Sequence, residues 1–265
     1  MTNRNCWLQD SNVESELETF FSEVDRQVST YYEQNSSTFE THLDGQIVAY
    51  LRNQQAIDLS MQRIQRERAN KHLPPFTLQF NAKHVTNKEI VHGADLGVVC
   101  RIQLPREYAI TKAALIQTKR LYMNSKAEFN DKCVYKELFT TAQTLKPQWE
   151  RLLNITPASV YALYGPLRLK VKRTIQNFGI RIVSAQHVAG IANTTSQFTA
   201  LDAYERGITF ADWIVNAFIC CNVGDTRQEV IDTAMGMNND FPVRYAIEIA
   251  ITGEERTLPL FEQSH

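Results

Sequence analysis

Apolar and polar positions follow helical spacing near the start of the chain. Between residues 13 and 32, apolar side chains recur every three or four positions among acidic ones, which predicts an amphipathic helix. This helix belongs to an N-terminal segment, residues 1–35, that either packs on the rest of the protein or docks against a partner or a second copy. From Phe39 onward apolar residues recur every four positions, so we predict a second helix that continues, with a bend, through Ile64.

After this region the pattern changes to the period-two alternation of strands. Residues 76–82 alternate apolar and polar side chains, and apolar runs near 90–103 and 112–121 predict two more strands. Further helices are predicted over 126–145, 147–153, 209–221 and 226–235, and further strands over 159–164, 179–184 and 243–251. Strands and helices interleaved in this way predict an α/β protein with a central mixed β-sheet flanked by helices.

Composition and charge describe an ordinary globular protein. The chain has 265 residues, of which 43% are hydrophobic and 22% charged, so it can bury a substantial core. A net charge of −1 means that any binding of nucleic acid has to rest on local basic patches. No apolar run reaches the length of a membrane span, the first residues lack signal-peptide character, and the five cysteines include no Cys-x-x-Cys. We therefore expect a cytoplasmic protein with reduced thiols and no membrane association.

Two short polar motifs stand out against these strands. Residues 93–97 read Gly-Ala-Asp-Leu-Gly at the start of one apolar run, and residues 117–119 read Gln-Thr-Lys near the end of the next. The period of a strand puts Gln117 and Lys119 on one face, and folding back across the polar connection brings Asp95 within their reach. A carboxylate, an amide oxygen and an ammonium can together hold a divalent metal and a water against a phosphodiester. In the alternative interpretation, Asp95 is a turn residue between two glycines, and Gln117 and Lys119 form the polar side of a half-exposed strand.

The motif Gly-x-Asp followed by Gln-x-Lys resembles the PD-(D/E)XK nuclease superfamily, in particular its Mrr-like restriction-endonuclease branch. The resemblance covers residues 36–122 and includes an upstream helical glutamate, Glu40, with Asp44 and Glu33 as alternatives to it. It implies a restriction-endonuclease-like core, in which one helix precedes a strand meander and crossover helices cover both faces. The chain departs from the superfamily at Gln117, where most members carry Asp or Glu, and a neutral ligand weakens a metal site.

The resemblance also implies a role for each motif residue. Asp95 would be the first ligand of a Mg²⁺ ion, for which Mn²⁺ can substitute, and the Gln117 side-chain oxygen would be the second. Glu40 would reach in from its helix, and Lys119 would orient or activate the attacking water and hold the scissile phosphate. Glu89 shares strand parity with Asp95 and is a supplementary acid in this interpretation; otherwise it is a surface glutamate beside a turn.

Two basic clusters are candidates for contact with a nucleic-acid backbone, although either could be a solvated surface. The first comprises Arg63, Arg66 and Arg68 at the end of the second helical region. The second comprises Arg168, Lys170 and Lys172, at alternating positions that can line one side of a hairpin.

These features predict a cytoplasmic, Mg²⁺-dependent nuclease with DNA as the favoured substrate. The nuclease domain would span 36–265, with a catalytic core over 36–190 and a C-terminal extension over 191–265. Small nucleases of this kind resemble effectors of prokaryotic antiviral defence, which implies a sensor partner such as an Argonaute or a nucleotide-signalling protein, or a second copy of the chain. The alternatives are an RNase or a nuclease of mixed specificity, and a noncatalytic nucleic-acid-binding or scaffolding subunit with a decayed site.

Overall fold

A computed structural model of the protein describes residues 11–86, 93–104, 108–123, 128–136, 138, 147–192, 197–220 and 223–253. The described helices are α1 (Ser11–Gln34), α2 (Glu40–Leu51), α3 (Gln54–Asn70), α4 (Gln148–Ile155), α5 (Ala185–Ala192), α6 (Ala200–Arg206), α7 (Phe210–Asp212), the π-helical η1 (Trp213–Ile219) and α8 (Gln228–Ala234). The described strands are β1 (Phe76–His84), β2 (Ala94–Leu104), β3 (Tyr108–Tyr122), β4 (Val134–Tyr135), β5 (Val160–Tyr164), β6 (Arg168–Val171), β7 (Thr174–Asn177), β8 (Arg181–Ser184), β9 (Phe198–Thr199), β10 (Ile208–Thr209) and β11 (Val243–Gly253).

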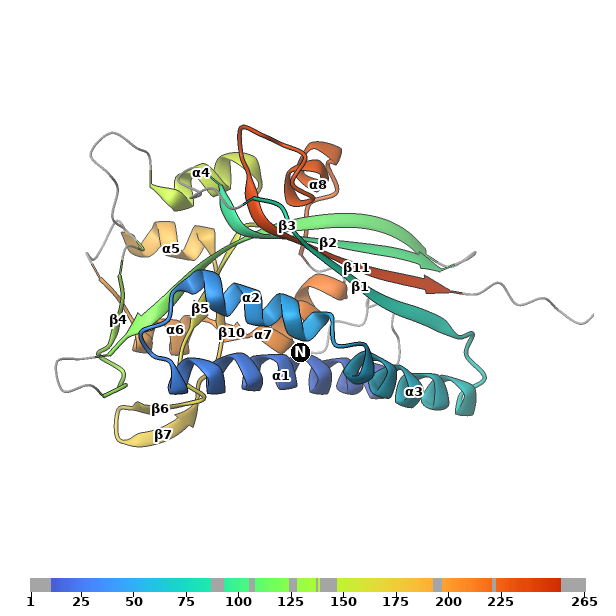
Figure 1. Ribbon diagram of the computed structural model, residues 1–265, viewed down its shortest axis with the longest axis horizontal. Helices are drawn as coiled ribbons and strands as arrows, with labels where there is room; N and C mark the ends of the chain where they lie inside the picture. Colours follow the sequence, from blue (N-terminus) through green and yellow to red (C-terminus); the bar gives the residue numbers. More distant parts are fainter. Residues whose placement is uncertain are drawn as a thin grey trace, which may run out of the picture.

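Most of these strands form one mixed sheet in the order β1-β11-β2-β3-β5-β8-β10. β2 and β3 are antiparallel, whereas β5 runs parallel to β3 and β11 runs parallel to β2. Helices flank the sheet on both faces (Figure 1), so the predicted α/β class with a central mixed sheet is confirmed.

One departure from the expected organisation concerns β11. This strand comes late in the chain, yet it lies between β1 and β2 and pairs with both. The predicted division into a core over 36–190 and an extension over 191–265 therefore does not describe the sheet. Residues far beyond 190 supply one of its inner strands.

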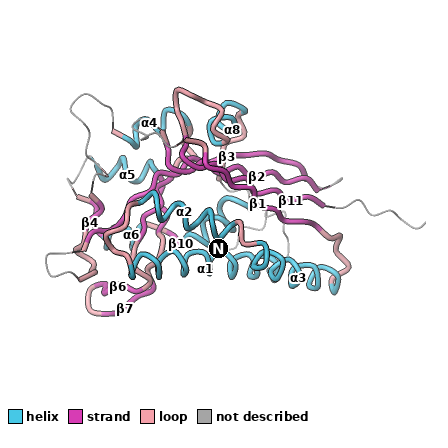
Figure 2. Tube along the Cα trace, viewed as in Figure 1, coloured by secondary structure: helices cyan, strands magenta, loops and turns pink. Residues whose placement is uncertain are grey.

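Alternation along the strands divides the apolar core between the two faces of the sheet. Val98 and Ile116 pack with the apolar residues of α1, α2 and α3, whereas Val99 and Leu115 pack with those of α4, α5 and α8. Figure 2 shows the strands running between these two helical layers. The predicted N-terminal amphipathic helix is confirmed as α1, and its apolar stripe is buried in the first of the two cores. That burial favours packing over docking for the apolar face of α1.

The structure corrects one predicted helix. Residues 126–145 were expected to be helical, but the described part of this segment contains an isolated bridge at Asn130 and the short strand β4. β4 is held by pairing with the end of β3 and with β9, which are distant in sequence. Tertiary pairing has overridden the local helical pattern.

The described cysteines differ in state. Cys100 and Cys133 are buried free thiols, as expected. Cys220 forms a disulfide, contrary to the prediction of reduced thiols. In the described ranges, none of the helices combines the length and the apolar character that crossing a bilayer requires.

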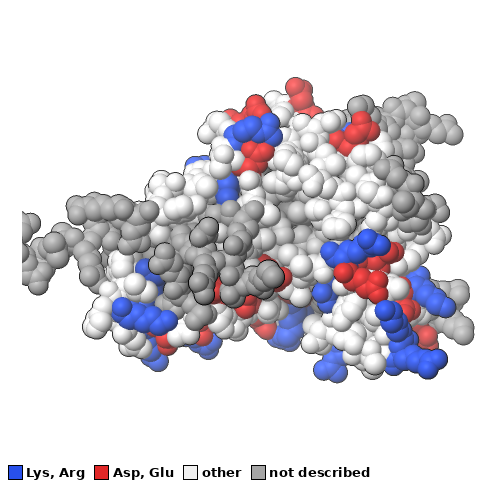
Figure 3. Space-filling model, turned by 180° about the vertical axis from the view of Figure 1, so that it is seen from behind, with Lys and Arg blue, Asp and Glu red and all other residues white. Residues whose placement is uncertain are grey.

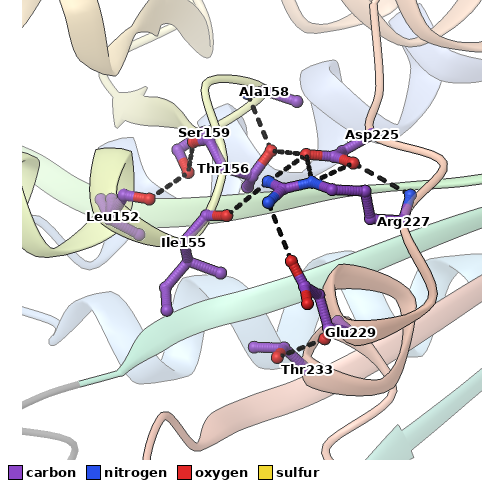
Figure 4. Close-up of polar contacts among 9 residues, drawn as sticks. All are labelled: Leu152, Ile155, Thr156, Ala158, Ser159, Asp225, Arg227, Glu229 and Thr233. Atoms are coloured by element: carbon purple, nitrogen blue, oxygen red, sulfur yellow. Dashed lines mark hydrogen bonds and ion pairs between the residues drawn. The ribbon is translucent and has the colours of Figure 1, made fainter.

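A polar network anchors the loop before α8 to the sheet (Figure 4). The backbone of Asp225 exchanges hydrogen bonds of 2.8 and 2.9 Å with Ala113 of β3. Its carboxylate accepts a 2.7 Å hydrogen bond from the buried hydroxyl of Thr156, and the Arg227 guanidinium donates both to this carboxylate and to the carbonyl of Ile155 at the end of α4. The hydrogen bonds from Arg227 lower the pKa of Asp225 to about 2. The network therefore joins β3, α4 and the loop that leads into α8.

We expect Asp225→Asn to destabilise the protein at neutral pH by about 1.5–3 kcal/mol, because hydrogen bonds to a charged group are lost or weakened. The folded-state pKa lies below the ordinary value of 3.8, so this contribution is present above about pH 4 and is lost as the pH falls toward 2. Urea unfolding from pH 7 downward measures it: the difference between wild type and variant should shrink in acid. A difference that stays constant with pH would contradict the ionic origin.

Candidate functional site

The β2–β3 hairpin brings the two sequence motifs together. The register pairs Leu96 with Ile116, so Asp95 at the start of β2 lies beside Gln117 near the end of β3. The Gln117 amide Nε2 donates a hydrogen bond to Asp95 Oδ2. The same oxygen accepts hydrogen bonds from the backbone N–H of Thr118 at 2.9 Å and from its hydroxyl at 3.0 Å. The predicted meeting of residues 95 and 117 is therefore found in the structure.

A local break in alternation explains how one carboxylate reaches both neighbours. Regular alternation would put Ala94 and Leu96 on one face, yet Ala94 packs with α4, α5 and α8 while Leu96 packs with α1, α2 and α3. The strand changes face here, as at a bulge, and turns Asp95 along the end of β3. The carboxylate consequently contacts Gln117 and Thr118, whose side chains leave β3 on opposite faces.

The acid that α2 contributes is Asp44. Its side chain is fully buried, accepts a 2.7 Å hydrogen bond from the Tyr164 hydroxyl, and lies 3.3 Å from the hydroxyl of Thr118. Glu40 begins the helix one turn earlier and instead accepts a 3.3 Å hydrogen bond from the backbone N–H of Arg120. The structure thus brings Asp44, rather than the predicted Glu40, to Asp95.

The two carboxylates share one hydroxyl group. Thr118 Oγ lies 3.0 Å from Asp95 Oδ2 and 3.3 Å from Asp44 Oδ2, but a hydroxyl carries only one proton to donate. Burial, reinforced by the negative charge of Asp95, raises the pKa of Asp44 well above its ordinary value. A protonated Asp44 can donate to Thr118 Oγ while Thr118 donates to Asp95. This chain of hydrogen bonds satisfies all three groups.

Two cationic side chains belong to the same end of the sheet. Arg244 of β11 places Nη1 3.1 Å from Asp95 Oδ1 and 3.8 Å from Asp44 Oδ2. Lys119 is partly buried on β3, two residues beyond Gln117 and on the same side of the strand by periodicity. Among the described residues, no hydrogen bond or ion pair joins Lys119 to Asp95 or Gln117. The structure therefore brings together residues 95 and 117, and Lys119 follows on the same strand without a hydrogen bond or ion pair to either of them.

The Gln117 side chain leaves one polar atom unused. Gln117 is 4% exposed, and its Oε1 is buried without a hydrogen-bond partner because the amide contacts Asp95 through Nε2. The buried hydroxyl of Tyr161, which neighbours Gln117 in the β3–β5 register, is also without a hydrogen-bond partner. Unpaired buried polar atoms are rare in folded proteins and call for a ligand or water. This corner of the site can accept a group that offers positive charge or protons.

The oxygen atoms gathered here suit a hard divalent cation. In the described part of the chain, no three or more His, Cys, Asp and Glu side chains are grouped so as to hold a metal. The available set is instead two carboxylates, Asp44 and Asp95, and the amide oxygen of Gln117. Mg²⁺ accepts few protein oxygens because it keeps several waters, so this set fits it. A metal site made of these oxygens does not require an arginine, so the presence of Arg244 needs a separate explanation.

The remaining predicted residues fare differently. Arg68 is 5% exposed, donates to the carbonyl of Pro74 and covers the ring of Phe76, so its predicted contact with nucleic acid is wrong. Arg63 forms an ion pair with Glu16, whereas Arg66 is exposed.

In the second predicted cluster, Arg168 and Lys170 are exposed on β6, and Lys172 forms an ion pair with Glu205. Acidic and basic side chains are interspersed on the face seen in Figure 3. Glu89 lies outside the described residues.

Two of the surrounding polar residues were not predicted to belong to this site. Tyr164 ends a strand that the apolar pattern predicts, but that pattern does not show that this strand pairs with β3 and brings Tyr164 to Asp44. Arg244 carried no signal, since the alternation of its strand does not reveal which strand it pairs with.

Comparisons of the chain with protein-family models, with curated proteins and with solved structures find no match. Function is therefore inferred from the geometry around Asp95.

Proposed function

We propose that the protein is a Mg²⁺-dependent nuclease that hydrolyses phosphodiester bonds, with DNA as its favoured substrate. The contact between Asp95 and Gln117 at one end of the β2–β3 hairpin carries this proposal. The buried Asp44 lies against the same pair, and Lys119 follows on the same strand. Service as a regulated defence effector is the context that the resemblance implies.

Asp95, Asp44 and the free Oε1 of Gln117 would hold the cation in this proposal. When bound, Mg²⁺ supplies acidification of a water and neutralisation of charge on the phosphoryl oxygens. Tyr164 and Thr118 position the two carboxylates through their hydroxyl groups. Lys119 then contributes an ammonium that orients the attacking water and stabilises the negative charge developing on phosphate.

Cleavage of defined substrates tests the proposal. The purified protein is incubated with labelled single- and double-stranded DNA and RNA, in Mg²⁺, in Mn²⁺ and in excess chelator. We expect DNA to be cleaved with either metal and to stay intact in chelator. Cleavage confined to RNA would identify an RNase, and failure to cleave any substrate with either metal would reject the enzyme.

One observation favours a second function, that of a noncatalytic nucleic-acid-binding or scaffolding subunit. Asp95 Oδ2 already accepts three hydrogen bonds, and Oδ1 is paired with Arg244. A carboxylate has about four lone-pair sites, so Asp95 is satisfied by protein groups alone. Binding of nucleic acid that is equal in Mg²⁺ and in chelator, with no cleavage, is the result expected of this second function.

A further inference from the structure

Arg244 reaches the candidate site from a strand outside the sequence motif. β11 runs parallel to β2, and its register pairs Val243 with Ala94 and Tyr245 with Leu96. Arg244 therefore stands beside Asp95 at the same level of the sheet. Its side chain is 15% exposed, so most of it is shielded from water and a small part reaches the solvent.

The guanidinium contacts the one part of Asp95 that other groups leave accessible. Oδ2 accepts from Gln117 Nε2, from the Thr118 backbone and from the Thr118 hydroxyl, whereas the only hydrogen bond that Oδ1 accepts among the described residues is the 3.1 Å bond from Arg244 Nη1. The same guanidinium lies 3.8 Å from Asp44 Oδ2. A divalent cation held by both acids would need these oxygens too.

The Arg244 guanidinium and a divalent cation exclude each other at Asp95, because both are positively charged. A guanidinium within ion-pair distance of both carboxylates neutralises one of their charges, and it repels a second cation strongly where water is scarce. The cation would also compete directly for the lone pairs of Oδ1. Occupation of that oxygen by metal therefore requires Arg244 to withdraw from it.

We propose that Arg244 is a built-in competitor of the divalent cation at Asp95, so that the metal-binding state forms only when Arg244 leaves Oδ1. This inference rests on the proposed function, because it concerns the cation which that function requires. It predicts weak metal binding while Arg244 is paired with Asp95. Because β11 carries Arg244, the position of this strand would then affect how tightly the site binds metal.

The test is calorimetric titration of Mn²⁺ into the protein without nucleic acid. We expect Arg244→Gln to bind Mn²⁺ about tenfold more tightly than wild type, within the range typical of coupled sites. The matched control is Arg101→Gln: Arg101 of β2 pairs with Glu248 of β11 at 2.5 Å across the same two strands, and its side chain is 40% exposed. This control should bind Mn²⁺ like wild type. Unchanged or weaker binding by Arg244→Gln would overturn the proposal.

A second measurement uses the wild-type protein, in case the variant does not fold. The side-chain Nε–H resonance of Arg244 is followed by NMR in arginine-labelled protein during titration with Mg²⁺, and Arg244→Lys provides its assignment. Competition predicts that the resonance shifts as Mg²⁺ binds. A resonance that keeps its position at saturating Mg²⁺ would overturn the proposal.

Cleavage assays on the same samples distinguish the nuclease function from the competition between Arg244 and the metal. Tighter Mn²⁺ binding by Arg244→Gln without cleavage by either protein supports the competition and rejects the nuclease. Metal-dependent cleavage by wild type, with no gain in Mn²⁺ affinity in the variant, supports the nuclease and rejects the competition. If neither protein binds Mn²⁺ or cleaves, both inferences fail.

Discussion

Replacement of Lys119 with alanine is expected to slow DNA cleavage by about 10²–10⁴-fold, the contribution typical of a positioned acid–base or electrostatic group. The ammonium would be lost from the side of β3 that carries Gln117, while the metal ligands stay in place. Within the described part of the chain, Lys119 forms no ion pair with Asp44 or Asp95, so the fold should tolerate its loss. Single-turnover cleavage of labelled DNA measures the effect, and thermal unfolding verifies that the variant is folded.

The control for this substitution is Lys83→Ala on β1. Lys83 is an exposed lysine on the edge strand of the same sheet, and it belongs neither to the candidate site nor to the two basic clusters. Its removal should leave the cleavage rate unchanged. Equal rates for Lys119→Ala and wild type would show that the ammonium has no part in the chemistry.

The largest effect on stability is expected from Gly97→Ala. A Cβ atom at this position of β2 would lie 2.0 Å from the carbonyl oxygen and 2.6 Å from the Cα of Ala234, which is the last residue of α8. Backbone atoms cannot rotate out of the way, so α8 would have to move off the sheet. We expect a loss of about 3 kcal/mol or more in the free energy of unfolding, at the upper end of the cost of overpacking.

Gly190→Ala is the matched control for this clash. Gly190 lies in α5, and a Cβ there would have no neighbour within 4 Å. Because alanine favours the helix over glycine, this variant should gain up to about 1 kcal/mol. Urea unfolding of both variants gives the comparison. A Gly97→Ala protein as stable as wild type would mean that β2 and α8 do not pack as closely as described.

Local patterns in the sequence predicted much of this fold. Helical spacing is a property of neighbouring residues, and it identified α1, α2 and α3 with a bend between the last two. For the same reason, period-two alternation identified β1 and β11, and apolar runs identified β2, β3 and β5. The proximity of Asp95 and Gln117 was predictable because an antiparallel pair joined by a short connection fixes its own register.

Features that depend on long-range placement could not be predicted. Asp44 and Glu40 both lie on α2, and only the rotation of the helix on the sheet decides which acid faces Asp95. β4 exists because β3 and β9 pair with it, whereas its surroundings in sequence suggested a helix. The alternation in β11 predicted a strand, but it did not indicate that this strand would lie between β1 and β2 and place Arg244 beside Asp95.

The position of β11 also constrains how the protein is made. On the ribosome, β1 and β2 emerge long before the strand that lies between them, so neither can pair with β11 when it is first synthesised. Their facing edges must stay apart until residues 243–253 arrive and insert. The central sheet is therefore completed late in translation or after it, and Asp95 acquires its arginine partner only in that step.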